Sequence, residues 1–337
     1  MIKKRISKML LGLMIGATLL SGCAKKDGKD GQVSGNGEDK TSDKEFKIGI
    51  SQLAEHPALD DARRGFEDGL KELGVNAKID FKNAQGDIPT ATTISQKFAN
   101  DKVDLIYAIA TPAVQSAKQV TSEIPILFSA VTDPVAAGIL DSFEKPGGNI
   151  TGTSDESPID KQLKIFNDLD PSIKKVGIIF NTSEPNSEIQ IEIAKKLAPK
   201  FGLEIVSMGI SNINEIPQTM DSMVKKVDAI YTITDNMVAS AINIISEKAI
   251  ANNMITVGAE DSHVGGGILI TDGLSYYELG KQTASMAKSI LIDGDKPSDI
   301  AVEKAQNTSK VFNEETMKKL NLDQGNTAFK DATKFEK

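Results

Sequence analysis

Small hydroxyl, amide and carboxylate side chains are the residues of this sequence that could bind a small charged molecule. They follow short apolar runs, as Thr111 follows LIYAIA and Asp235 follows AIYTIT. Hydroxyls and free amides suit a carboxylate, whereas Asp or Glu suits an ammonium, so such a set could hold a zwitterion. The candidates at such positions are Glu55, Thr111, Ser129, Thr132, Asp235, Asn236 and Glu260.

A repeated segment relates two of these candidates to each other. KVDAIYTITDNMVASA at 226–241 matches KVDLIYAIATPAVQSA at 102–117 in nine of sixteen positions, which aligns Thr111 with Asp235. The repeat that contains Thr111 could therefore bind a carboxylate, and the repeat that contains Asp235 could bind an ammonium. Ser, Thr, Asp and Asn are also ordinary helix caps, so capping alone stays an alternative for each candidate.

The sequence contains no motif that is typical of catalysis. Neither a Gly-x-Ser-x-Gly elbow nor a Gly-x-x-x-x-Gly-Lys phosphate loop is present. The two histidines, His56 and His263, lack metal-ligand spacing, and a single cysteine cannot form an internal disulfide. We therefore expect a binding protein with no catalytic residue, no cofactor and no metal site.

From residue 46 onward, short apolar runs alternate with helical patterns, which predicts parallel βαβ units. We expect strands at 47–53, 77–81, 104–109 and 125–130, with helices that begin near Pro57, Ile88 and Pro112. In an open parallel sheet, ligands bind beyond the carboxyl ends of the strands, where helix amino termini offer unpaired N–H groups. The candidate residues occupy those ends.

The same order of elements starts again in the second half of the chain. KVGIIFN at 175–181 is similar to KIGISQL at 47–53, so the two repeats are offset by 128 and 124 residues. Repeats of this length indicate two similar domains and not a solenoid, whose units have about 20–50 residues. Links between them are expected at 147–157, 265–275 and 299–304.

The predicted fold is therefore α/β, with two doubly wound parallel-sheet lobes joined by three crossovers. Lobe 1 comprises 46–153 plus 274–298, and lobe 2 comprises 154–273 plus 299–337, with further helices expected at 276–292 and 313–320. Two such lobes that face one another would bring both sets of strand ends into one cleft.

Residues 1–22 have the layout of a secretory signal, with a basic head followed by an apolar run. The uncharged stretch 9–24 has 16 residues, fewer than the roughly 20 that a membrane-spanning helix needs. LSGC at 20–23 resembles the bacterial lipobox, in which the chain is cut before the cysteine and a diacylglycerol is attached to its sulfur. The alternative is an ordinary secreted protein with an unmodified Cys23.

Residues 23–45 are expected to form a flexible tether that starts at the lipidated Cys23. They are rich in Gly, Ser, Asn, Asp and Lys, a composition that cannot form a core. Removal of the four basic residues of the leader changes the net charge from -8 to -12, since -8 - 4 = -12. An acidic surface argues against nucleic acid as a partner.

Seven segments together resemble the family of ABC-transporter substrate-binding lipoproteins that includes tryptophan- and tyrosine-binding members. They are ISQLAEHPALDDARRGFEDGL, AIATPAVQSA, FSAVTDPVAAG, EKPGGNITGTSD, TDNMVASA, AEDS and YYELGKQTA, and they span about residues 48 to 283. The resemblance implies a type I periplasmic-binding-protein fold and an amino acid ligand of aromatic type. Carried over by motif, it implies ligand contacts from Glu55, Thr111, Ser129, Thr132, Asp155, Asp235, Asn236 and Glu260.

The resemblance also implies how the protein is used. It would be lipid-anchored through Cys23 on the outer face of the cell membrane, in a bacterium with a single membrane, and would deliver its ligand to an ABC permease driven by an ATPase. Three alternatives stay open: an adhesin that binds a host surface, a sensor module for a membrane receptor, and a binder of another small solute such as a sugar. Closure of the lobes would follow from contacts that the ligand makes only in the closed state.

Overall fold

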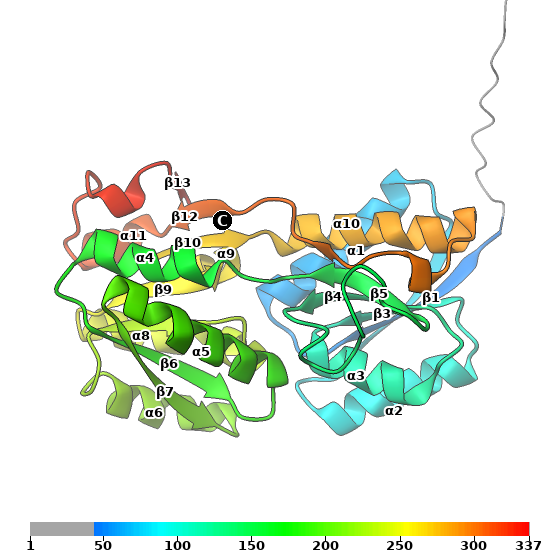
Figure 1. Cartoon of the computed structure of the whole chain (residues 1–337), viewed down its shortest axis with the longest axis horizontal. Coiled ribbons are helices and arrows are strands. Elements are labelled where there is room, and N and C mark those ends of the chain that lie inside the picture. Colours follow the sequence, from blue (N-terminus) through cyan, green and yellow to red (C-terminus); the bar gives the residue numbers. More distant parts are fainter. Residues whose placement is uncertain (1–43, 337) are drawn as a thin grey trace, which may run out of the picture. The chain divides into compact units, whose positions relative to one another are not determined.

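The computed structural model describes residues 44–336, so Cys23 and the predicted signal peptide lie outside the described residues. The first half of the chain alternates strands and helices as the sequence predicts (Figure 1). Its elements are β1 (Phe46–Gln52), α1 (Pro57–Glu72), β2 (Ala77–Asn83), α2 (Ile88–Asn100), β3 (Leu105–Ile109), α3 (Thr111–Val120), β4 (Ile126–Val131) and β5 (Ile150–Ser154).

The second half repeats this order and adds C-terminal elements. Its helices are α4 (Ile159–Leu169), α5 (Pro185–Leu197), α6 (Ile216–Met223), α7 (Asn236–Ser240), α8 (Ile242–Ala251), α9 (Asp261–Gly265), α10 (Tyr276–Lys288) and α11 (Glu314–Lys319). Its strands are β6 (Lys175–Asn181), β7 (Glu204–Ile210), β8 (Ala229–Thr232), β9 (Ile255–Glu260), β10 (Ile270–Leu274), β11 (Glu303–Lys304), β12 (Ser309–Phe312) and β13 (Thr333–Lys334).

The strands form two sheets, one in each lobe. The first has the order β11-β5-β4-β3-β1-β2, and the second has the order β13-β12-β10-β9-β8-β6-β7. All neighbouring strands are parallel except β10 and β12. Helices cover both faces of each sheet; α1 and α10 lie side by side on one face of the first sheet (Figure 1). This is the predicted pair of doubly wound α/β lobes.

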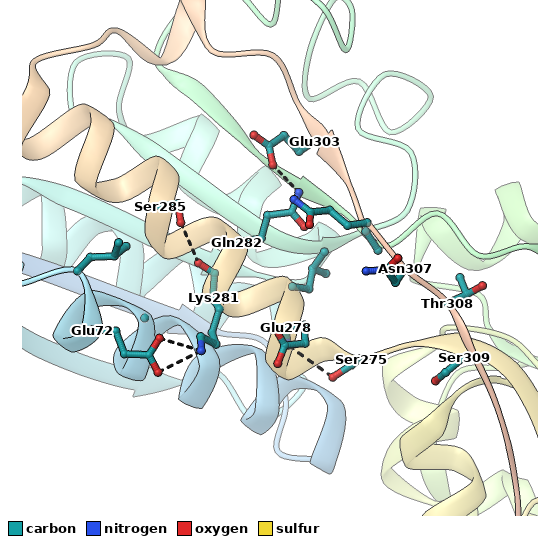
Figure 2. Close-up of a pocket in the computed structure, with 15 residues that line it drawn as sticks. Glu72, Ser275, Glu278, Lys281, Gln282, Ser285, Glu303, Asn307, Thr308 and Ser309 are labelled. Carbon is teal, nitrogen blue, oxygen red and sulfur yellow. Dashed lines mark hydrogen bonds and ion pairs between the residues drawn. The ribbon is translucent and has the colours of Figure 1, made fainter. Parts of the chain in front are cut away.

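The chain passes between the lobes three times, through residues 155–158, Ser275 and residues 305–308. The third linker starts later than the sequence indicated. Residues 303–304 pair with β5, and Val302 packs in the core of the first lobe, so the segment 299–304 lies with the first sheet although the sequence assigned it to the second lobe. Figure 2 shows this segment beside α10, where Gln282 donates a hydrogen bond to the carboxylate of Glu303.

Local sequence explains where the helices begin and end. In α1, Pro57 occupies the first turn, where its missing N–H is not needed, and Leu59, Phe66 and Leu70 are buried at helical spacing. The helix ends before Gly74, which has φ +70°, a conformation that costs glycine little. Tyr107 and Tyr231, at equivalent positions in the repeat, are both buried in their lobes, as the sequence predicts.

Helices α1 and α10 are in backbone contact, which only glycine permits. A Cβ atom at Gly65 would lie 2.0 Å from the carbonyl oxygen of Tyr277, and one at Gly280 would lie 2.1 Å from the carbonyl oxygen of Ala62. This contact attaches α10 to the first lobe after the chain has returned from the second. It therefore fixes the end of the linker at Ser275.

We expect Gly280→Ala to lower the free energy of unfolding by about 1–3 kcal/mol, because the added methyl group would separate the two helices. Helix propensity alone would favour alanine by about 1 kcal/mol, so a net loss must come from packing. Urea denaturation measures the change. Gly325→Ala is the matched control, since the nearest atom to its added Cβ lies at 3.4 Å. Equal stability of the two variants would contradict the proposed packing constraint.

Candidate ligand-binding site

A small cavity lies between the two lobes, at the carboxyl ends of their strands; here it is called the deep cavity. Its volume is about 10 Å³, enough for about one water molecule. It is lined by His56, Leu59, Ala130, Asp155, Asn186, Thr234, Asp235, Asn236, Ala239, Glu260 and Tyr276. These residues come from both lobes and from the first linker.

Hydrogen bonds cross directly between the lobes around this cavity. His56 Nε2 lies 3.1 Å from Asn236 Oδ1, and the hydroxyls of Thr132 and Thr234 are 3.3 Å apart. The lobes are therefore in a closed arrangement, with the predicted residues Thr132 and Asn236 at their contact.

Three of the side chains that line the deep cavity have a buried polar atom without a hydrogen-bond partner. These atoms are Nδ1 of His56, Oδ1 of Asp155 and Oδ1 of Asn186. The amide nitrogen of Asn186 donates to the carbonyl oxygen of Thr234 at 2.9 Å, so its unpaired atom is the oxygen, an acceptor. Buried polar atoms without a partner are rare in folded proteins and are costly.

The unpaired nitrogen of His56 is also an acceptor. The side-chain nitrogen of Asn236 donates to Glu184, so the Asn236 oxygen faces His56 and accepts from its Nε2. Burial lowers the pKa of His56, against opposing effects of Glu260 and Asn236, and the ring is neutral at pH 7. A neutral ring that donates from Nε2 accepts at Nδ1. Three unpaired acceptors thus belong to side chains that line the deep cavity.

Asp155 lies in the first linker, and its carboxylate contacts the start of α10, just after the second linker. Its Oδ2 accepts a hydrogen bond of 2.6 Å from the hydroxyl of Tyr276, while its Oδ1 is unpaired. Burial raises the pKa of Asp155 to about 6, although hydrogen bonds from Tyr276 and Thr132 lower it. A cationic group in the cavity would favour the ionised carboxylate.

Glu260 ends β9 and contributes a second carboxylate to the cavity. Burial alone would raise its pKa, yet His263, His56 and Ser262 bring it down to about 2. Its Oε1 lies 3.0 Å from His263 Nε2 and accepts from the Ser262 hydroxyl at 2.8 Å. Asp155 has a fully buried oxygen without a partner, whereas Glu260 has none.

Asp235 lines the cavity, but its oxygens are already used. Oδ1 accepts from the backbone N–H of Val238 at 2.9 Å, which makes Asp235 the N-cap of α7. Oδ2 accepts from the N–H of Asn181 at 2.6 Å and from the hydroxyl of Ser187 at 2.7 Å. These contacts favour capping, the alternative that the sequence left open for this residue.

Glu184 accompanies Asp235 at the start of α7. It accepts from the N–H groups of Asn236 and Met237 at 3.2 and 3.3 Å. Burial and the neighbouring Asp235 carboxylate raise the pKa of Glu184 to about 7, against its hydrogen bonds, and burial also raises the pKa of Asp235. Two buried carboxylates thus share the donors of one helix start.

The backbone of β4 is distorted beside the cavity. Ala130 has φ +59°, an uncommon value for a residue with a Cβ atom, and the pairing of β4 with β5 shifts register between Phe128 and Val131. A bulge of this kind re-aims side chains. Backbone in such sparsely populated conformations is concentrated at ligand sites.

The remaining predicted residues take different positions. Thr111 is buried, and its hydroxyl has no hydrogen-bond partner. The Ser129 hydroxyl is 2.7–3.0 Å from the hydroxyls of Tyr107, Thr153 and Thr283, a network inside the first lobe. Glu55 is exposed at the edge of the cleft. The structure thus places Asp155, Asp235, Asn236 and Glu260 around the deep cavity, with Thr132 at the lobe contact.

Four polar residues that line the deep cavity are not among the predicted ligand contacts: His56, Asn186, Thr234 and Tyr276. His56 and Thr234 follow β1 and β8, so the strand-end rule includes them, but it does not rank them above their neighbours. Asn186 lies in the first turn of α5, beyond β6, and Tyr276 starts α10 after the second linker. The position of Asn186 beyond β6, which is equivalent to that of His56 beyond β1, was the available signal.

Three larger pockets contain residues of both lobes or of a linker. The outer pocket, of about 480 Å³, lies between loops of both lobes, and the side pocket, of about 410 Å³, lies on α1, α7 and α9. A groove of about 500 Å³ runs over α10 and the third linker (Figure 2). The charged groups Lys281 and Glu72 pair within this groove, and none of the unpaired buried atoms of the described residues belongs to its lining.

Two parallel-sheet lobes, three linkers and a polar cavity between the lobes define a two-lobed solute-binding protein of the type I periplasmic class. The same fold occurs in a glucose-galactose binding protein of Geobacillus stearothermophilus, at 15% identity and a TM-score of 0.61, and in a carbohydrate transporter of Acidothermus cellulolyticus, at 12% identity and a TM-score of 0.60. A family model of ABC transporter substrate binding proteins matches residues 47–335. The chain belongs to this family, whose members are binding proteins and not enzymes.

One curated relative and two solved structures are informative. The chain is 43% identical over 323 residues to the tyrosine-binding protein of Clostridioides difficile strain R20291, covering 95% of this chain and 93% of that protein. A Streptococcus pneumonia ABC domain in complex with L-Trp is 33% identical, with a TM-score of 0.81 over 85% of this chain and 99% of that one. The ligand-free, open structure of a Clostridium difficile substrate binding protein with adhesive properties is 42% identical, with a TM-score of 0.67 over 86% and 99%.

The structural similarity of these two proteins to this chain does not follow their sequence identity. The ligand complex has the lower identity but the higher TM-score. This order agrees with the hydrogen bonds between the lobes, which define a closed arrangement. Within residues 44–336, no helix is long and apolar enough to cross a membrane.

Asp155→Asn is expected to stabilise the ligand-free protein at pH 7.5. The folded-state pKa of Asp155 is about 6 and the ordinary value is 3.8, so ionisation opposes folding above pH 6 by about 1–3 kcal/mol. Asparagine keeps an acceptor for Tyr276 without the charge. Thermal unfolding at several pH values checks this: the gain should be full above pH 6 and should vanish towards pH 4. A variant less stable than the wild type at pH 7.5 would contradict it.

Proposed function

We propose that the protein binds an aromatic amino acid, tyrosine or tryptophan, between its lobes and delivers it to the permease of an ABC importer. The observation that carries this proposal is the set of three unpaired acceptors, on His56, Asp155 and Asn186. An ammonium group offers three N–H donors and is about the size of a water molecule, so it fits both the chemistry and the volume of the deep cavity. The tyrosine-binding relative and the L-Trp complex support the aromatic side chain.

Closure of the lobes is driven by the difference in contacts between the open and the closed state. The three acceptors belong to the first lobe, the first linker and the second lobe, so only the closed arrangement brings them around one ligand group. A ligand shifts the equilibrium only by its differential affinity for the two states. Because closure excludes water, the ionic hydrogen bond to Asp155 is strengthened there.

We extend the proposal to the other predicted contacts. Asp155 takes the ammonium, the buried Thr111 hydroxyl is available for the carboxylate, and Thr132 and Asn236 join the lobes on closure. Glu260 adds negative charge to the site, and Glu55 lies at its entrance. Asp235 positions the start of α7, and Ser129 holds the hydroxyl network inside the first lobe. Asp235 as the ammonium ligand, which the repeat suggested, is the competing assignment. The predicted lobe limits, apart from the segment 299–304, are retained as part of this proposal.

Asp155→Asn should weaken binding of L-tyrosine or L-tryptophan by about 1.5–3 kcal/mol, because a charged hydrogen bond is lost. Calorimetry on the purified protein measures it, with sugars as the comparison ligands. Wild-type affinity should fall as pH drops below about 6, where protonation of Asp155 competes with the ammonium, and the variant should lack this step. Asp235→Asn is the matched variant: a larger loss there than at Asp155 would reassign the ammonium, and binding of sugars alone would refute the amino acid proposal.

The lipid anchor at Cys23 is a second part of the proposal. It would hold the carrier on the outer face of the membrane, near its permease, and so raise the effective concentration. Two acyl chains hold a protein to a bilayer far better than one.

Adhesion is a second candidate function, favoured by the relative with adhesive properties.

Cys23→Ser should release the protein into the medium or leave its leader uncleaved, because the serine hydroxyl is no substitute for the acylated thiol. Fractionation of cells and labelling with a radioactive fatty acid check this outcome. A lipid-labelled, membrane-bound Cys23→Ser protein would show that the anchor lies elsewhere. Binding of amino acids by the purified variant should equal that of the wild type, which separates anchoring from recognition.

A further inference from the structure

The outer pocket lies next to the deep cavity, and its lining combines apolar side chains from both lobes with polar ones that include Glu55 and Glu184. Leu53, Ile88 and Pro112 come from the first lobe, and Ile213 and Met237 come from the second. Its volume of about 480 Å³ falls within the range of about 300–1,000 Å³ of small-molecule sites. Its composition differs from that of the deep cavity, where His, Asn and carboxylate side chains predominate.

Two isoleucines on opposite lobes remain unusually accessible in this pocket. Ile88 and Ile213 each keep 39% of their surface exposed, although large apolar side chains are normally covered. Ile88 begins α2, directly beyond β2, and Ile213 follows β7. Both therefore stand at the carboxyl ends of strands, where ligands bind in such sheets. A flat apolar group between them would contact both lobes at once.

Asn236 connects the two compartments, because it lines both the deep cavity and the outer pocket. Its oxygen faces His56 across the lobe contact, and its nitrogen faces Glu184. The deep cavity has room for a group of about one water molecule, so the rest of a bound molecule must extend past this partition.

The side pocket is the other route out of the deep cavity, since His56 and Ala239 line both. It brings Asp61 of the first lobe close enough to Asp261 of the second for their charges to interact, and both line its wall. Opposed carboxylates are poor neighbours for an aromatic ring, whose face is electron-rich. Glu55 lines both pockets, and Glu184 lines the outer pocket but accepts the N–H groups of Asn236 and Met237. Apolar contact from Ile88 and Ile213 therefore makes the outer pocket the better environment.

We infer that the outer pocket is the side-chain subsite of the ligand, where Ile88 and Ile213 sandwich an aromatic ring and Asn236 marks its boundary with the ammonium site. This inference rests on the proposed function and adds the residues that decide which amino acid is bound. Selectivity comes from apolar contact on both ring faces. Amino acids with small side chains leave the two isoleucines uncovered and gain little from closure.

The test is the double variant Ile88→Ala with Ile213→Ala in the full chain, titrated with L-tyrosine, L-tryptophan and L-alanine by calorimetry. Both isoleucines are partly exposed, so the fold should tolerate the change, and circular dichroism confirms it. Loss of apolar contact on both ring faces should weaken binding of the aromatic amino acids at least tenfold, because each methylene matters in an apolar pocket. The weak affinity for L-alanine should stay within twofold. Phe335→Ala, in the side pocket, is the control and should leave all three affinities unchanged.

Each alternative has a distinct outcome. Weaker aromatic binding in Phe335→Ala, with no change in the isoleucine variant, would move the ring to the side pocket and overturn the inference while the proposed function stands. Unchanged binding with reduced uptake in cells would make the isoleucines a contact for the permease and would also overturn it. A wild-type protein that binds no aromatic amino acid would refute the proposed function and this inference together.

Discussion

Burial of carboxylates between the two lobes is the constraint on which the rest of the site depends. Asp155, Glu184, Asp235 and Glu260 are all buried, and each must replace the water that it loses. Glu184 and Asp235 accept the N–H groups at the start of α7, and Glu260 accepts from the Ser262 hydroxyl beside the His263 ring. Of the four carboxylates, Asp155 alone has a fully buried oxygen without a hydrogen-bond partner. Asp155 is therefore the acid that gains most from a donor on a ligand.

The duplicated lobes explain both the geometry of the cleft and its asymmetry. Equivalent strand ends face each other, yet Thr111 and Asp235 occupy equivalent positions with different roles: the threonine hydroxyl is unpaired, whereas the aspartate caps α7. Asp155 lies in a linker, outside both repeats. Its bond to Tyr276, just after the second linker, joins two of the three connections at the point where a cation would bind.

The alternation of strands and helices was predictable because it depends on local periodicity and on turn residues such as Pro57 and Gly74. The limits of the third linker were not, because Glu303 and Lys304 are exposed polar residues whose strand pairing depends on β5. Asp235, which follows β8, and Glu260, which ends β9, both line the deep cavity, and their ligand contacts stay a prediction. Which acid keeps a free oxygen could not be predicted, since it depends on donors such as Ser187 and His263 that only the folded chain brings close.

The unpaired acceptors also determine what a ligand adds to the closed arrangement. Each buried acceptor without a partner costs about 1–3 kcal/mol. One water molecule in the deep cavity can donate to two of the three acceptors, whereas an ammonium group has three N–H donors. The hydrogen bonds between His56 and Asn236 and between Thr132 and Thr234 join the lobes with or without a ligand. An ammonium ligand therefore favours the closed state more than water does, because it satisfies the acceptor that water leaves unpaired.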